Sequence, residues 1–185
     1  MRPGRCPRCG KASHEPGCKL GLHGHGVIYG RKLLGPADAD GEARQQRVDA
    51  RRYVCTACGA TVIVVPAGFA PRRHYGAGAI GLALFLYGVL ELSARQVRER
   101  IRPFRTVGYS APDKWRTLIG WTEAASEGRL FRAIRASPGS FSPRQRAARV
   151  AMSLLEQAGP VGAQATAEQR VFAGAVHAAL RPLGW

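Results

Sequence analysis

Two copies of a Cys-x-x-Cys-Gly motif, with 45 residues between Cys9 and Cys55, constrain this chain more than any other feature of its sequence. They read CPRCG from Cys6 and CTACG from Cys55. With two residues between the cysteines, both sulfurs of a tight turn can point at one ion, and the following glycine permits the left-handed backbone that completes the turn. Four thiolates satisfy the tetrahedral coordination of zinc and leave no open position for a substrate. We therefore predict a structural Zn2+ site whose ligands are Cys6, Cys9, Cys55 and Cys58.

The cysteines leave other interpretations open. Four reduced cysteines without a metal would make the matched pairs a coincidence, and a rubredoxin-like iron site is chemically possible although no redox partner domain is evident. The segment between the two motifs carries further groups with ligand chemistry, namely His14, Cys18, His23 and His25. Cys18 with His14 and one later histidine could form a second metal site. Alternatively, Cys18 is a small buried residue and the histidines are polar groups of a loop.

Basic residues far outnumber acidic ones. The chain has 28 Lys and Arg against 12 Asp and Glu in 185 residues, and a formal net charge of +16. Such an excess draws a protein towards polyanions, whose counterions are released on binding. Arg supplies 24 of the basic residues, so a GC-rich genome can account for part of the excess, but not for the shortage of acids. The charge favours nucleic acid as a partner.

Turn and cap signals predict the secondary structure. β-branched and aromatic residues at 52–54 and 61–65 flank the second cysteine motif and predict a hairpin, with 27–29 as a third candidate strand and 36–42 as a surface loop. Helices are expected over residues 76–90, 94–101, 114–125, 143–158 and 166–180. Cap residues support the last four of these helices, namely Ser93, Ser110 with Asp113, Ser142 before Pro143, and Thr166 with Gln169.

These elements predict an α+β fold in three parts. A small N-terminal zinc ribbon of β-hairpins, with a long inserted loop, occupies residues 1–75. A mostly helical region resembling a helix-turn-helix unit occupies 76–126, and a C-terminal helical hairpin occupies 127–185. Apolar residues of that hairpin recur at helical spacing and could pack on the core or pair two chains; they are Val150, Leu154, Leu155, Val171, Phe172, Val176 and Leu180.

The apolar run at 76–90 raises the question of a membrane. It has 15 residues, fewer than the roughly 20 that a spanning helix needs, and it contains four glycines. A buried helix is the interpretation that we favour, with a membrane span as the alternative. Because no secretory signal is visible at the N-terminus and the cysteine usage fits a reducing compartment, we expect a cytoplasmic, nucleoid-associated protein without a membrane partner.

Basic residues concentrate over residues 94–116, where seven Lys and Arg stand against two acids. In a helix-turn-helix unit the third helix enters the major groove with its N-terminal residues against base edges, a position that Lys114 and Arg116 would occupy. Trp121, six residues after Trp115, should lie on a different part of that helix and in the core. The full set of candidate DNA contacts is Arg95, Arg98, Arg102, Arg105, Lys114 and Arg116. The alternative is an ordinary helical bundle with solvated arginines.

The order of these motifs is similar to that in a known family. Over residues 6–126 the chain has five features in this order: CPRCG, YVCTACGATVIVVP, an apolar helix, LSARQVRERI and a Trp-bearing basic helix. This order resembles the zinc-ribbon and helix-turn-helix module at the N-terminus of bacterial insertion-element transposases, and small stand-alone proteins that carry it. The resemblance implies DNA binding at transposon ends or related sites, with the four motif cysteines as zinc ligands. The long insertion between the motifs departs from a minimal ribbon.

The acidic residues do not support a catalytic site. The catalytic half of such transposases uses three separated carboxylates to hold two metal ions for phosphoryl transfer. After Asp113, the acidic residues that remain are Glu123, Glu127, Glu156 and Glu168. His74 and His177 also lack an evident nucleophile and orienting acid. We therefore expect no enzymatic activity.

The function that we expect is zinc-dependent binding of double-stranded DNA, in mobile-element or transcription control. A transposase, a recombinase or a second copy of the chain is a further expected partner. One alternative is a protein-interaction adaptor that docks its zinc ribbon and C-terminal helices onto a recombinase or polymerase. Another is an RNA-binding ribbon, against which the lack of clustered aromatic residues argues.

Overall fold

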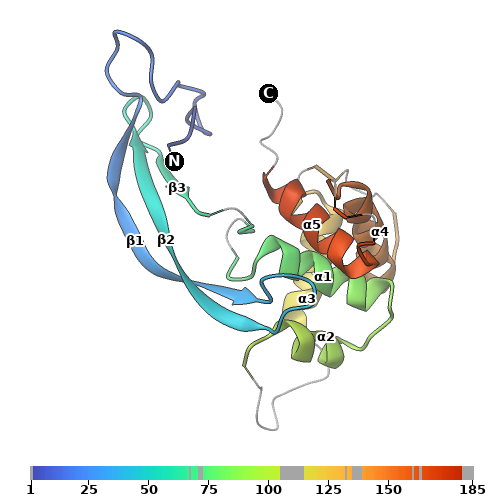
Figure 1. Cartoon of the computed structure of the whole chain (residues 1–185). Coiled ribbons are helices and arrows are strands. Elements are labelled where there is room, and N and C mark those ends of the chain that lie inside the picture. Colours follow the sequence, from blue (N-terminus) through green and yellow to red (C-terminus); the bar gives the residue numbers. More distant parts are fainter. Residues whose placement is uncertain are drawn as a thin grey trace. The chain divides into compact units, whose positions relative to one another are not determined.

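The structure is a computed structural model that describes residues 2–66, 68–70, 73–104, 115–131, 133–134, 139–159, 161–162 and 164–180. Within these residues, the elements in chain order are β1 (Leu22–Gly35), β2 (Arg44–Cys55), β3 (Thr61–Val64), α1 (Ala77–Gly88), α2 (Ala94–Ile101), α3 (Arg116–Ser126), α4 (Pro143–Glu156) and α5 (Ala167–Leu180) (Figure 1). The strands form one antiparallel sheet. The predicted α+β class is therefore confirmed.

The chain divides into two compact units. The first, here the cysteine unit, comprises residues 1–32 and 47–66, and the second, the helical unit, comprises residues 33–46 and 67–185. Most of β1 and β2 belongs to the cysteine unit, while the hairpin end that joins them belongs to the helical unit. The helices expected in two separate parts, 76–126 and 127–185, lie in one unit because α1 packs against helices of both parts.

The segment between the two cysteine motifs is mostly strand and not the long loop that the sequence predicts. β1 and β2 have 14 and 12 residues, respectively, and form a long ribbon (Figure 1). β3 pairs only with the end of β2, from Arg51 opposite Val64 to Val54 opposite Thr61. The earlier part of β2 therefore has β1 as its one neighbour in the described sheet. The expected loop at 36–42 joins these two strands, but Ala39 within it is buried.

Side-chain caps fix the beginnings of three helices where the sequence predicts them. Ser93 accepts from the N–H of Gln96, and the Gln96 side chain accepts from the N–H of Ser93, which is a complete capping box. Ser142 begins α4 in the same way, with Pro143 at the first helical position. Thr166 begins α5 through the same exchange with Gln169. By contrast, α3 begins at Arg116 without a side-chain cap; Ser110 and Asp113, the expected cap of this helix, lie outside the described residues.

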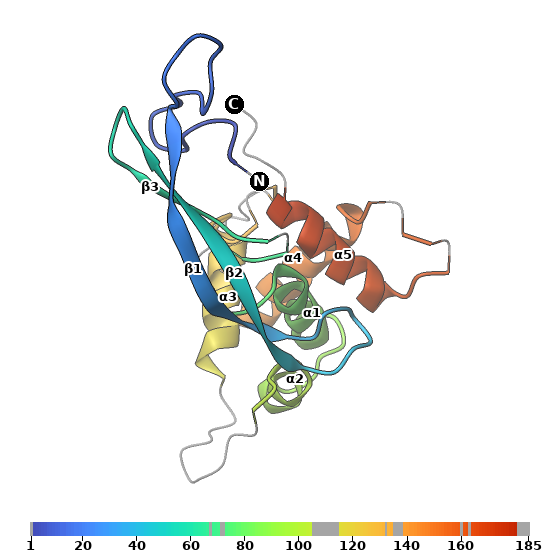
Figure 2. The same ribbon diagram turned by 60° about the vertical axis from the view of Figure 1, so that its left-hand side comes forward.

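Helix α1 is the centre of the helical unit, in contact with the other four helices (Figure 2). All of its residues except Tyr87 are buried, which explains why it is apolar on every side. Its glycines allow close packing. A Cβ on Gly81 would overlap the Cβ of Ala175 in α5, and a Cβ on Gly88 would overlap the backbone nitrogen of Ala148 in α4. The predicted buried helix is confirmed, and the C-terminal hairpin packs on it.

No helix in the described part of the chain has both the length and the apolar character needed to cross a membrane.

Trp115 and Trp121 meet in one aromatic cluster. Two residues six positions apart on one helix would point in different directions. Their ring centroids are 5.1 Å apart, and Tyr75 packs edge-on against Trp121 at 4.8 Å. The prediction that the two tryptophans lie on different parts of the helix surface is wrong, because Trp115 is not in the helix. It is the N-cap residue, with an extended backbone. Its ring can therefore fold back over the first turn. Both tryptophans are buried, as the sequence predicts for Trp121.

Candidate metal centre

The two Cys-x-x-Cys-Gly motifs fold into the same turn. In the first, the N–H of Cys6 donates to the carbonyl of Lys11 at 2.8 Å, and the N–H of Gly10 donates to the carbonyl of Cys6 at 2.9 Å. The second motif repeats both bonds from Cys55 and Gly59, each at 2.9 Å. Gly10 and Gly59 have φ angles of 72° and 67°, the left-handed conformation that glycine adopts without strain. The turn geometry predicted from the motif is therefore confirmed.

The two turns bring four sulfur atoms together. The Sγ atoms of Cys6 and Cys58 are 3.7 Å apart, and those of Cys9 and Cys55 are 3.6 Å apart. All four lie within 4.8 Å of one another. These separations are well beyond the roughly 2.05 Å of a disulfide bond, and all four cysteines are free thiols. The four residues could therefore hold one metal ion at their centre.

Backbone dipoles make this a favourable place for thiolates. The N–H groups of Cys9 and Arg8 lower the pKa of Cys6 to about 6, and the N–H of Cys58 lowers the pKa of Cys55. At Cys9 the N–H of Lys11 also lowers the pKa, but the neighbouring thiols and burial outweigh it and raise the pKa to about 12. Like charges at these distances repel one another. A cation at the centre would allow all four sulfurs to ionise.

The apolar core around the four sulfurs is very small. Its buried residues are Cys6, Leu22, Tyr53 and Cys55. Polar contacts attach the segment before β1 to the second turn, because Thr56 donates its N–H to Gly21 at 2.9 Å and its hydroxyl to the carbonyls of Leu20 and Gly21 at 3.2 Å. A core of this size supplies little stability to a unit of about 50 residues. The centre thus adds a second cross-link between the two halves of the cysteine unit, which the pairing of β1 with β2 also joins.

The other histidines and cysteine of this segment do not join a second cluster. His14, Cys18, His23 and His25 are all exposed. Among the residues that the structure describes, the four motif cysteines are the one group of three or more His, Cys, Asp or Glu side chains with converging ligand atoms. The prediction that Cys18 could be a buried small residue is wrong, since the turn at Gly17 leaves it at the surface.

The predicted DNA-contacting residues that the structure describes lie on α2, at its C-terminal cap and at the start of α3. Arg95 and Arg116 are exposed, and Arg95 pairs with Glu99 at 3.1 Å. Arg98 and Arg102 are partly buried. Arg105 and Lys114 lie outside the described residues. Of the predicted set, the described residues therefore offer two exposed cations, on α2 and at the start of α3.

Other arginines of the helical unit have structural partners. Arg100 donates to the carbonyls of Ala39 and Gly41, both at 2.6 Å, and so holds the end of the β1–β2 hairpin. Arg144 donates to the carbonyl of Tyr87 at 2.7 Å, near the end of α1, and stacks over the Tyr87 ring at 4.5 Å. These arginines satisfy backbone carbonyls, so part of the basic charge of this unit serves its own fold.

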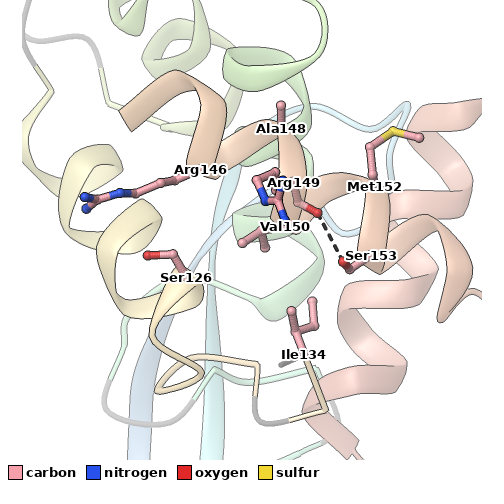
Figure 3. Close-up of a pocket in the computed structure, with 8 residues that line it drawn as sticks. All are labelled: Ser126, Ile134, Arg146, Ala148, Arg149, Val150, Met152 and Ser153. Carbon is pink, nitrogen blue, oxygen red and sulfur yellow. Dashed lines mark hydrogen bonds between the residues drawn. The ribbon is translucent and has the colours of Figure 1, made fainter. Parts of the chain in front are cut away.

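A surface cavity beside α4 offers no catalytic constellation. Its volume is about 350 Å3, and Figure 3 shows Arg146 and Arg149 of α4 at its edge, with Ser126 and Ile134 on facing segments. The Ser153 hydroxyl donates to the carbonyl of Arg149 at 3.1 Å, within the helix. The described residues that line this cavity include no His, Cys, Asp or Glu. They therefore supply no general acid or base.

One feature of the cysteine unit was missed by sequence reasoning, namely an exposed basic ribbon. Its residues His23 to Val27 are all exposed, Tyr29 is 77% exposed, and Arg47, Arg51 and Arg52 are exposed on β2. The available signal was the density of Lys and Arg on both sides of the polar loop at 36–42. Residues 23–30 lack the alternation of apolar and polar positions that usually reveals a strand, whereas residues 47–51 show it, with Val48 partly buried and Ala50 buried between exposed polar residues.

Comparison with protein-family models, with curated proteins and with solved structures finds no match to this chain. The likeness to the transposase module therefore stays a prediction from the motifs.

Proposed function

We propose that this chain is a non-enzymatic, zinc-dependent protein that binds double-stranded DNA. Zinc is the metal that the donor set fits best. Four thiolates around an ion with bonds of about 2.3 Å place the sulfurs roughly 3.8 Å apart in a regular tetrahedron, close to the 3.6 and 3.7 Å found here. Such a closed site has no position for substrate or water, so its role is to hold the fold of the cysteine unit.

The observation that carries DNA binding is the charge of the cysteine unit. Its 52 residues hold ten Lys and Arg against Glu15 and Asp49, a net charge of +8 and half of the total of +16 on less than a third of the chain. Zinc with four thiolates carries two net negative charges, which leaves the unit strongly basic. A small rigid unit of this charge would gain affinity for DNA by releasing counterions from the phosphates. Arg95 and Arg116 of the helical unit would add contacts to phosphates.

The biological setting follows from the motif order. Resemblance to the transposase module supports a role at the ends of a mobile element or in control of transcription. A recombinase, or a second copy of this chain on a symmetric site, is the further partner that we propose. A transposase would supply catalytic carboxylates of the kind that we do not assign to this chain.

Selection of bound duplexes from a random DNA library, with zinc-loaded protein at near-physiological salt, tests the proposed function. We expect a sequence motif to be enriched over successive rounds, because base-edge contacts add to the charge-driven affinity. Uniform recovery of all duplexes, or no recovery, would contradict sequence-specific DNA binding and favour the adaptor function instead. Symmetry of an enriched motif would show whether two chains bind together.

A further inference from the structure

We propose that the β1–β2 ribbon of the cysteine unit, and not a helix, reads the DNA by lying in its major groove. This inference rests on the proposed function and names the element that performs it. The part concerned is residues 23–32 of β1 and 47–52 of β2, all of which belong to the cysteine unit; it is called the reading ribbon below.

Over residues 47–50, before β3 pairs with β2 from Arg51 onwards, the reading ribbon is two-stranded, which is the shape that the groove requires. Neighbouring strands lie about 4.8 Å apart, and the major groove of B-form DNA, about 12 Å wide, admits a two-stranded ribbon. Consecutive side chains of a strand point to opposite faces. Because His23 to Val27 are all exposed, both faces of β1 are open there, whereas β2 buries Ala50. A strand in an ordinary sheet would bury one of its faces, so this exposure is unusual for a purely structural element.

The side chains of the reading ribbon have the chemistry that DNA requires. Its cations are Arg31, Lys32, Arg47, Arg51 and Arg52, and its one acid is Asp49, which accepts from the N–H of Gly30 at 3.0 Å. Arg47 and Arg51 are exposed and, four residues apart on one strand, point to the same face. Arginine can hold guanine through two parallel hydrogen bonds in the major groove.

Glycines of β1 leave room for the arginines of β2. The Nε of Arg52 donates to the carbonyl of His25 at 2.9 Å, so this side chain crosses β1 beside Gly26. The Cδ of Arg47 lies 3.9 Å from the position of a Cβ on Gly30. A Cβ at either glycine would make an ordinary van der Waals contact with the arginine at 3.9 Å, so it is the positive φ angles of 96° at Gly26 and 64° at Gly30 that favour glycine. Arg52 and Arg47 therefore lie against the backbone of β1 at these two glycines.

Tyr29 gives an independent indication that this surface is an interface. At 77% exposure, it is the most exposed large hydrophobic residue in the described part of the chain. An aromatic ring left in water amid arginines contributes nothing to a core, whereas tyrosine is enriched where proteins bind partners. On the reading ribbon its ring could contact a thymine methyl group and its hydroxyl a phosphate or base edge.

The partner that fits is B-form DNA and not duplex RNA. The major groove of A-form RNA is deep and narrow and does not admit protein side chains to its bases. A ribbon that binds through this groove should therefore discriminate strongly between the two duplexes. Charge alone would give no such discrimination.

Two pairs of charge-matched variants test the reading ribbon. The ribbon variant carries Arg47→Gln and Arg51→Gln, and the helical variant carries Arg95→Gln and Arg116→Gln. The affinity of each for a fluorescein-labelled DNA duplex is measured by fluorescence anisotropy over a range of salt concentrations. All four arginines are exposed, so both variants should fold, which zinc content and circular dichroism check. We expect the ribbon variant to lose more than tenfold in affinity, to lower the salt slope by about 2 and to lose its preference for the selected sequence. The helical variant, which loses phosphate contacts alone, should lose less affinity and keep that preference. Equal losses, or a greater loss in the helical variant, would overturn the ribbon while leaving DNA binding intact. No binding by the wild-type protein would overturn both.

Two further measurements locate the contact. Tyr29→Ala should weaken binding several-fold, while Ile63→Ala, an exposed residue on β3, should not; the reverse order would contradict the inference. On a bound DNA duplex, methylation of guanine N7, which lies in the major groove, should block binding. Interference only at adenine N3, in the minor groove, or equal affinity for a duplex RNA of the same sequence, would exclude major-groove reading.

Discussion

Replacing Cys55 with serine is expected to unfold the cysteine unit while the helical unit stays folded. Cys55 is buried and contributes one of four converging sulfurs, and a serine hydroxyl is a poor zinc ligand. The apparent zinc-binding free energy of small structural sites, on the order of 10–16 kcal/mol, is largely folding free energy. With only four buried core residues, the cysteine unit has no comparable source of stability. Hydrogen exchange should therefore lose its protection in β1, β2 and β3, and mass spectrometry should find no bound zinc.

Cys18→Ser is the matched control for this change. Cys18 is exposed and lies outside the sulfur cluster, so the same chemical substitution should leave zinc content and strand protection at wild-type values. The helices should keep their protection in both variants, because their core is separate from that of the cysteine unit. If Cys55→Ser behaves like Cys18→Ser, the four cysteines do not hold a structural metal.

Replacing Gly174 with alanine should destabilise the helical unit by at least about 2 kcal/mol, the middle of the range for overpacked cores. A Cβ on Gly174, in the middle of α5, would overlap the carbonyl oxygen of Leu154 in α4 and lie 2.8 Å from its carbonyl carbon. These are backbone atoms, so they cannot rotate away as a side chain could. The helices must move apart, and the fit of both against α1 is lost. Thermal unfolding followed by circular dichroism should show the melting temperature several degrees lower.

Gly120→Ala, in the middle of α3, separates this packing effect from helix propensity. Nothing lies within 4 Å of a Cβ at Gly120, so alanine should stabilise the helix by up to about 1 kcal/mol through its better propensity. The two substitutions are chemically identical, and their effects should have opposite signs. A stabilising Gly174→Ala would show that α4 and α5 do not pack as closely as the structure places them.

The sequence predicts the helices well because their signals are local. Ser93, Ser142 and Thr166 each form the helix cap that the sequence predicts, and in the structure each accepts from the N–H of a glutamine three residues on. The turns of the metal centre are equally local, since two cysteines and a glycine determine the backbone of each. What brings the two turns together is the pairing of β1 with β2, which the motif spacing alone does not reveal.

The ribbon is hard to predict for a physical reason. Strands are recognised in sequences by apolar residues that alternate with polar ones, and this alternation exists because one face of the sheet is buried. The stretch from His23 to Val27 is exposed at every position and contains Gly24 and Gly26, so burial leaves no pattern in it. Residues 61–64, with their β-branched side chains, pair beside the small core and are readily predicted.

The most direct test of zinc-dependent DNA binding is the affinity of one protein preparation for duplex DNA in three states: zinc-loaded, stripped with a chelator, and reloaded. We expect saturable binding in the first state, a loss of at least tenfold in the second as the cysteine unit unfolds, and full recovery in the third. Unchanged affinity after zinc removal would contradict the metal-held unit as the DNA-binding element. Absence of binding in all three states would contradict DNA as the partner.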